Sequence, residues 1–124
     1  MPVVKGATAP VFSLPGTTFT GLAAPSRGAK ETCVWRISVD PGTPATPHRV
    51  DKEEIFVLTS GRMLITLAGA EHALEPGDVL IVPADTLFGL DNPYQERAEL
   101  VVVMPVGGVA RIPGQDPIMP PWAQ

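Results

Sequence analysis

Proline and glycine recur so often along this chain that a long uninterrupted helix cannot form. The 124 residues contain 15 prolines and 12 glycines, and both residue types end or weaken regular secondary structure. No segment between them shows sustained helical periodicity. Several of these segments are short and rich in Val, Ile and Leu, which is typical of β-strands. The sequence therefore predicts an all-β protein.

The predicted strands are joined by sequences that favour tight turns. Ser60-Gly61 and Ala68-Gly69-Ala70 suit hairpins, because glycine adopts positive φ at little cost. Glu75-Pro76-Gly77-Asp78 is a strong β-turn sequence, since proline presets φ for its first corner. Many short strands separated by turns predict an antiparallel sandwich or barrel. The strands are expected at residues 32–39, 54–60, 63–67, 79–82 and 100–104, with a shorter one around 72–74.

Length and composition narrow the class of protein. The chain suits a single domain spanning residues 1–124, with a barrel core at about 31–105 and terminal extensions that pack on it or on a partner. Trp122, in the proline-rich C-terminal extension, is expected to make such a contact. A net charge of -4, with nine basic residues scattered singly, argues against a nucleic-acid partner.

Localisation is predicted from what the sequence lacks. The N-terminal segment does not have the charged head and apolar stretch of a signal peptide. No apolar run approaches the ~20 residues that a membrane-spanning helix needs, so no membrane partner is expected. The single cysteine, Cys33, lies in an apolar run and is interpreted as a buried structural thiol. These features predict a cytoplasmic protein.

The stretch from Gly42 to Gly61 resembles the first signature of the cupin superfamily. That signature is a glycine, five residues, His-x-His, three or four residues, a glutamate, six residues and a glycine. Gly42, His48, Glu54 and Gly61 all fall in register. Downstream, Gly77 and Pro83 match the start of the second signature, and Asn92 matches its end. The resemblance covers about residues 31–104 and implies a small jelly-roll barrel, the double-stranded β-helix of cupins.

The resemblance also implies where a metal would sit, and here the sequence departs from the family pattern. Cupin signatures supply four metal ligands, two histidines and a glutamate from the first and one histidine from the second. Val50 stands at the second of these positions, and Phe88 replaces the histidine of the second signature. Asp85 replaces its glycine. With only His48 and Glu54 left as ligands, no tightly bound cofactor is expected, and a divalent transition metal stays a weak alternative.

The resemblance therefore leaves one imidazole and one carboxylate facing a largely apolar chamber. If His48 and Glu54 lie within hydrogen-bond reach, they form a candidate acid–base pair for catalysis. The alternative is a residual pair that satisfies its own hydrogen bonds inside the barrel. Strand alternation predicts further pocket residues. These are Val50, Phe56, Leu58, Phe88 and Arg36, although a surface position is the default for Arg36, and His72 is expected to be exposed.

Three functions remain open from the sequence. The first is binding of a small, moderately hydrophobic molecule by His48 and Glu54, without redox chemistry. The second is a metal-independent isomerase, epimerase or cyclase that uses the same pair as acid and base. The third is a metal-dependent dioxygenase, against which the two missing ligands count directly.

A homodimer is the expected assembly, because an open jelly roll leaves strand edges unpaired. Residues 11–14 or 18–22 of one copy are predicted to cover such an edge on the other.

Overall fold

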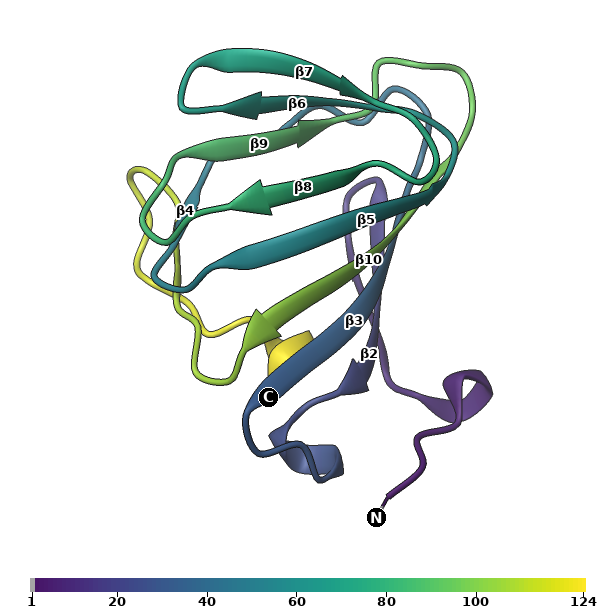
Figure 1. Ribbon diagram of the computed structural model, residues 1–124, viewed down its shortest axis with the longest axis vertical. Helices are drawn as coiled ribbons and strands as arrows, with labels where there is room; N and C mark the ends of the chain where they lie inside the picture. Colours follow the sequence, from purple (N-terminus) through teal and green to yellow (C-terminus); the bar gives the residue numbers. More distant parts are fainter. Residues whose placement is uncertain (1) are drawn as a thin grey trace.

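The computed structural model describes residues 2–124 and consists almost entirely of β-strands and turns (Figure 1). The chain therefore has the all-β jelly-roll fold that the sequence predicts. The strands are β1 (Val11–Leu14), β2 (Thr17–Ala23), β3 (Thr32–Val39), β4 (Arg49–Val50), β5 (Glu54–Ser60), β6 (Met63–Leu67), β7 (Ala70–Leu74), β8 (Val79–Val82), β9 (Phe88–Asp91), β10 (Ala98–Pro105) and β11 (Ala110–Arg111). Three short 3₁₀ helices accompany them, η1 (Gly6–Thr8), η2 (Pro25–Arg27) and η3 (Pro121–Ala123).

The strands form three antiparallel sheets. The largest has the order β1-β2-β3-β10-β5-β8, and the others are β7-β6-β9 and β11-β4. Four strands have the bounds expected from the sequence, namely β3, β5, β6 and β8, whereas β10 and β7 are longer than expected. The strands β4, β9 and β11 were not predicted. β4 and β11 have two residues each, and β9 contains Gly89 and Asp91, residue types that are depleted in strands.

Alternation along the central strands separates a core face from an outer face. On β3, Cys33, Trp35, Ile37 and Val39 are buried, whereas Arg36 is exposed. Strands β5 and β10 alternate in the same way, which gives one continuous core inside the barrel. The Cys33 thiol is fully buried, in agreement with a structural role, and burial raises its pKa.

The N-terminal strands pair within the chain. β2 lies against β3, and β1 lies against β2. In the single chain, β2 therefore covers the edge of β3, and the turn at Pro15 and Gly16 folds β1 back on β2 as an intramolecular hairpin. Pairing of these strands with an edge of a second copy stays a prediction.

The C-terminal extension returns to the same region. η3 packs on β2 and β3, and the ring of Trp122 stacks on Phe19 with centroids 3.7 Å apart. The Trp122 side chain thus packs on the barrel of its own chain, one of the two contacts expected for it.

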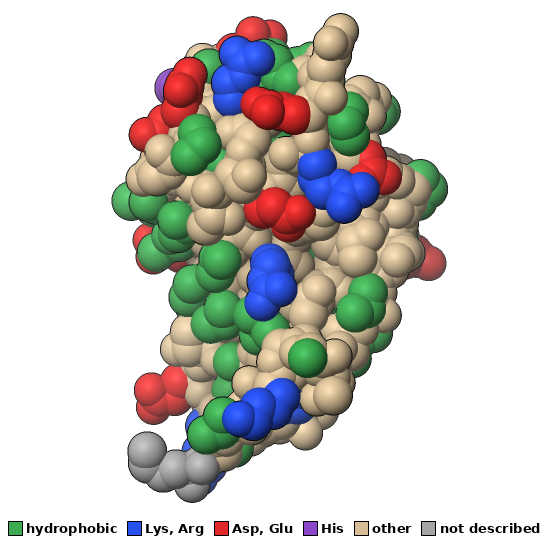
Figure 2. Space-filling view, turned by 90° about the vertical axis from the view of Figure 1, so that its right-hand side faces the viewer, with side chains coloured by type: hydrophobic (Ala, Val, Ile, Leu, Met, Phe, Trp, Pro, Cys, Tyr) green, Lys and Arg blue, Asp and Glu red, His purple; other side chains and the backbone are tan. Residues whose placement is uncertain are grey.

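The outer face of the six-stranded sheet is also hydrophobic. Ile55 lies beside Ile81 on β8, and Val57 lies beside both Val79 on β8 and Val101 on β10. Val79 and Ile81 are 50% and 56% exposed. Figure 2 shows hydrophobic side chains gathered toward the left of the view at mid-height, next to a basic side chain, with most other charged side chains higher up. An antiparallel sheet with one free face usually turns polar side chains to water, so this outer face is unusual.

No helix within residues 2–124 is both long and apolar enough to span a bilayer.

Candidate functional site

The barrel contains a cavity of about 400 Å³ whose lining includes residues of the N- and C-terminal segments. Its walls are mostly hydrocarbon and aromatic, and several separate parts of the chain contribute to them. The lining residues that matter below are Phe19 of β2, Trp35 of β3, His48, Val50 of β4, Glu54 and Phe56 of β5, Leu90 of β9, and Trp122 of η3.

His48 reaches the cavity from the segment that precedes β4. Its backbone N–H and carbonyl pair with Phe88 of β9, at 3.0 Å in both directions, and its ring packs on the Phe88 ring with centroids 4.4 Å apart. The Nδ1–H group donates to the carbonyl oxygen of Thr46 at 2.8 Å. This assignment leaves Nε2 of the neutral ring as an acceptor.

Burial lowers the pKa of the His48 imidazole below its ordinary value of 6.5. The hydrogen bond to Thr46 acts in the opposite direction but is the smaller effect. His48 is therefore a neutral base at pH 7.

Glu54 is the first residue of β5, opposite Val82 of β8. Its side chain is 5% exposed, and within residues 2–124 its Oε1 atom has no hydrogen-bond partner. Burial raises the pKa of this carboxyl from 4.5 to about 8, because a charged carboxylate is poorly stabilised away from water. Glu54 is consequently a protonated acid over most of the neutral range.

His48 and Glu54 line the same cavity without touching. Among the residues that the structure describes, the two side chains form neither a hydrogen bond nor an ion pair within 4.0 Å. The direct pair considered from the sequence is thus not formed, and Glu54 is not satisfied by its histidine neighbour. Each group remains available to a molecule placed between them, and one is set up to accept a proton while the other is set up to donate one.

The donor set does not fit a resident transition metal. Val50 is buried at one of the two positions where the cupin pattern has a further histidine, and Phe88 at the other. Across residues 2–124, His, Cys, Asp and Glu side chains nowhere gather in threes around a possible ion site. Zinc and related ions need three or four protein donors for tight binding, and one imidazole with one protonated carboxyl provides fewer.

Three of the expected pocket residues are not among those that line the cavity, and for Arg36 this agrees with the surface position taken as its default. Leu58 lies two residues beyond Phe56 on β5. It is fully buried in the core and does not line the cavity. Phe88 lies behind the His48 ring and packs on Phe56, so it supports the wall rather than forming it. Arg36 points to the outer face of β3, because alternation turns its neighbours Trp35 and Ile37 inward. Val50 and Phe56 do line the cavity, and His72 is exposed as expected.

Sequence reasoning predicted Phe56 but missed the other aromatic residues of the wall, Phe19, Trp35 and Trp122. Alternation on β3 turns Trp35 inward, and this signal could have placed it beside the cavity. Phe19 and Trp122 carried no such signal, because the N- and C-terminal segments meet only in the tertiary structure.

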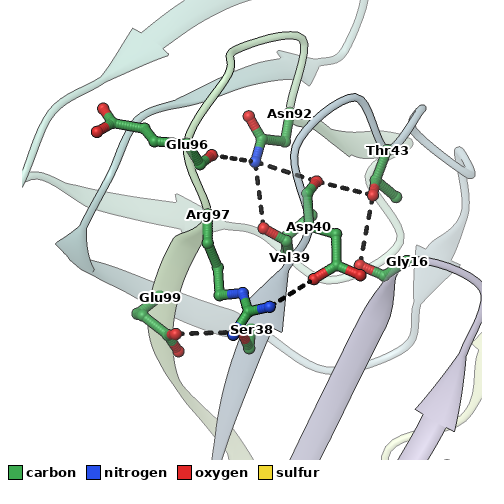
Figure 3. A network of polar contacts seen from close by, with 9 residues as sticks. All are labelled: Gly16, Ser38, Val39, Asp40, Thr43, Asn92, Glu96, Arg97 and Glu99. Carbon is green, nitrogen blue, oxygen red and sulfur yellow. Dashed lines mark hydrogen bonds and ion pairs between the residues drawn. The ribbon is translucent and has the colours of Figure 1, made fainter.

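Asn92, which aligns with the end of the second cupin signature, has a structural role at one end of the barrel (Figure 3). Its fully buried amide Nδ2 donates to the carbonyl oxygens of Val39, Asp40 and Glu96 at 3.2, 3.2 and 2.9 Å. Its Oδ1 accepts from the N–H of Tyr94. Asn92 thereby ties the β9–β10 connection to the end of β3, away from the cavity.

Comparison with known proteins identifies a matching protein family and individual relatives. The Cupin domain model matches residues 35–104. Vicilin GC72-A of Gossypium hirsutum is 30% identical over 93 residues, which cover 72% of this chain and 15% of that protein. This chain thus spans about 15% of the length of the curated relatives that it matches.

Two solved structures are similar over nearly the whole chain. The polyketide cyclase RemF from Streptomyces resistomycificus superposes with a TM-score of 0.79 at 21% identity, covering 94% of this chain and 87% of that one. A sugar phosphate isomerase of the cupin superfamily from Silicibacter pomeroyi gives a TM-score of 0.76 at 18% identity, covering 93% and 83%. At these identities the likeness shows a shared fold. It does not show that the activity is shared.

Proposed function

The chain belongs to the cupin family, and from this premise we propose that it binds a small, mainly apolar molecule inside its barrel without a tightly bound metal. One observation carries the proposal. A cavity of about 400 Å³ with mostly apolar walls contains a buried carboxyl that has no hydrogen-bond partner within residues 2–124. Burying a polar group without a partner destabilises a fold by roughly 1–3 kcal/mol. A bound molecule that pairs with Glu54 offsets this cost.

Filling the cavity tests this function. Leu90 is half-buried and lines the cavity, so Leu90→Trp adds bulk there, while Leu90→Met keeps the volume nearly unchanged. A suitable probe is 2-acetylnaphthalene, a small and mainly apolar molecule. Titration calorimetry with this compound should show one binding site on the wild type and on Leu90→Met, and none on folded Leu90→Trp. Equal binding by wild type and Leu90→Trp would place the molecule elsewhere and refute the proposal.

A second candidate function is metal-independent proton transfer on the bound molecule, as in an isomerase, epimerase or cyclase. The observation that favours it is that one cavity is lined by a proton donor and a proton acceptor. Glu54 is protonated and His48 is neutral. An acid and a base with pKa values near the working pH are efficient catalysts. A polyketide cyclase and a sugar phosphate isomerase share the fold, which agrees with this candidate as an analogy only.

Glu54→Gln separates the two candidates. Glutamine keeps a hydrogen-bond donor of similar shape but cannot transfer a proton. A catalyst should lose turnover by at least ~100-fold with little change in ligand affinity, whereas a binding protein has no turnover to lose. Catalysis that survives this substitution would rule out Glu54 as the acid.

The metal-dependent dioxygenase is the least supported of the three functions. Two of the four ligand positions are the hydrocarbon side chains of Val50 and Phe88, which cannot coordinate a metal ion.

We further propose that two copies associate through the outer face of the six-stranded sheet. Val57, Val79 and Val101 form part of a continuous apolar surface there. Arg36 lies beside Val101 and forms no ion pair within residues 2–124. Glu99 lies on the same face, two residues before Val101 on β10, and within residues 2–124 its carboxylate accepts a hydrogen bond from Ser38 alone. A two-fold axis can bring Arg36 of each copy to Glu99 of the other, so the surface is complementary to itself.

A further inference from the structure

Among residues 2–124, no lysine or arginine lines the cavity. The titratable lining residues in this part of the chain are His48 and Glu54 alone. Arg36, the nearest arginine on β3, faces the opposite side of the sheet. An anionic molecule would therefore lose its hydration without gaining a counter-charge, which is strongly unfavourable in an apolar site.

Two residues that line the cavity, Trp35 and Glu54, have buried polar atoms without a partner within residues 2–124, and both groups can donate hydrogen bonds. The Nε1–H of Trp35 is a donor only and finds no acceptor within residues 2–124. The Glu54 carboxyl, whose Oε1 is likewise unpaired, donates when it is protonated. Burial favours that protonated form. These two unpartnered groups thus call for acceptors on the bound molecule, while Nε2 of His48 is left to accept a hydrogen bond.

The two donors come from strands that are not neighbours in the sheet. Trp35 lies on β3 and Glu54 on β5, with β10 between them. Neighbouring strands lie ~4.8 Å apart, so the two backbones are separated by about 10 Å across the sheet. The rings of Phe19, Trp35, Phe56 and Trp122 line the space. Aromatic walls favour flat ring systems, which stack on them.

We propose that the cavity selects an uncharged aromatic molecule bearing a carbonyl oxygen, and that it discriminates against the carboxylate of the same shape. The selection rests on the binding function proposed above. It goes further by assigning the charge and the hydrogen-bonding polarity of the ligand, and by giving Trp35 a role in specificity.

Three naphthalenes of nearly equal shape test this assignment. 2-Acetylnaphthalene is neutral with a carbonyl acceptor, 2-naphthoate is its anionic counterpart, and 2-isopropenylnaphthalene has neither charge nor acceptor. By titration calorimetry at pH 7, the acetyl compound should bind at least ~10-fold more tightly than the carboxylate and about fivefold more tightly than the hydrocarbon.

Variants of the two donors provide the controls. Glu54→Leu and Trp35→Phe should each reduce the preference for the acetyl compound over the hydrocarbon, and should leave hydrocarbon binding within about twofold of wild type. Glu54→Gln keeps a donor and should keep the preference. Since each single variant tests one donor, a folding defect in one leaves the other informative.

The outcomes separate the two proposals. If none of the three compounds binds to the folded wild type, the binding function itself is refuted. If the hydrocarbon binds as well as the acetyl compound, or if the carboxylate binds best, the binding function stands and the assignment of ligand chemistry is overturned.

Discussion

Residue by residue, the departures from the cupin signatures have different structural effects. Asp85 replaces a signature glycine but has a φ of 60°. It keeps the left-handed backbone conformation that glycine adopts freely and that aspartate tolerates better than most residues. Phe88 replaces a ligand and still faces inward, where it packs on His48 and Phe56. The backbone of the motif is thus retained while its metal chemistry is replaced by hydrophobic packing.

The raised pKa of Glu54 predicts a pH-dependent stability. In the unfolded chain the carboxyl ionises near pH 4.5, whereas in the folded protein it holds its proton up to about pH 8. The stabilising contribution is therefore complete below about pH 4.5 and is lost as the pH rises through 8. Its full size is on the order of 3–5 kcal/mol.

Denaturation by urea at pH 5 and at pH 8.5 measures this effect. The wild type should lose free energy of unfolding relative to Glu54→Gln over this interval, because glutamine does not titrate. A constant difference between the two proteins would show that Glu54 is not the buried acid described here.

The two hydrocarbon positions predict how metal binding can be changed. The purified wild type should contain clearly less than one equivalent of Mn, Fe, Ni or Zn by elemental analysis. The double substitution Val50→His and Phe88→His provides three imidazoles with Glu54, a set that suits these ions. It should bind Zn²⁺ or Ni²⁺ at least ~100-fold more tightly than wild type.

Glu54→Gln in the double-histidine background is the matched control and should weaken the gained site. A stoichiometric ion in the wild type that is lost in Glu54→Gln would contradict the assignment of a non-metal site.

At the scale of single elements, turn geometry explains most of the strand boundaries. Gly61, between β5 and β6, has a φ of 77°, and a Cβ there would collide with the backbone carbonyl of Arg97. Glycine is required at this position both for the turn and for the close approach of the β9–β10 connection. The same signature residue thus fixes a hairpin and its packing.

The hairpin between β6 and β7 contains a residue that is poorly suited to its conformation. Ala68 and Gly69 form its two-residue loop with φ values of 49° and 85°. Positive φ at both positions characterises the type I′ turn, in which Asn-Gly is favoured. Ala68→Asn should raise the free energy of unfolding by roughly 0.5–1 kcal/mol.

Thermal unfolding of Ala68→Asn beside Ala70→Asn measures this. Ala70 is an exposed residue of β7, where asparagine has no turn to stabilise, so the control should not gain stability. A destabilised Ala68→Asn would mean that the loop has a different conformation in solution.

For the whole molecule, the apolar outer face makes assembly the main question. Light scattering at micromolar concentration should give the mass of a dimer. Val101→Lys places a charge in the centre of the outer face and should yield a monomer. Val3→Lys, at a residue that is 78% exposed in the N-terminal segment, should remain dimeric.

Charge reversal identifies the arrangement of the two copies. Arg36→Glu and Glu99→Arg should each weaken the dimer, and the two together should restore it at least in part. A wild type that is monomeric at these concentrations refutes the assembly, and single reversals without effect refute this geometry.

The sequence alone determined the features that depend on local chemistry. Short β-branched runs and proline–glycine turns were enough to predict the strands β3, β5, β6 and β8, because strand formation and turn conformation depend on neighbouring residues. The spacing of His48, Glu54 and the signature glycines predicted the fold, and the hydrocarbon residues at positions 50 and 88 predicted an altered site.

Only the tertiary structure decided what surrounds that site. The aromatic wall joins Phe19 and Trp122, which are about a hundred residues apart in the chain, and no local pattern encodes such a contact. The separation of His48 from Glu54, and the absence of a cation beside them, likewise depend on how distant strands pack. Burial by those strands, rather than residue type, makes Glu54 an acid near neutral pH.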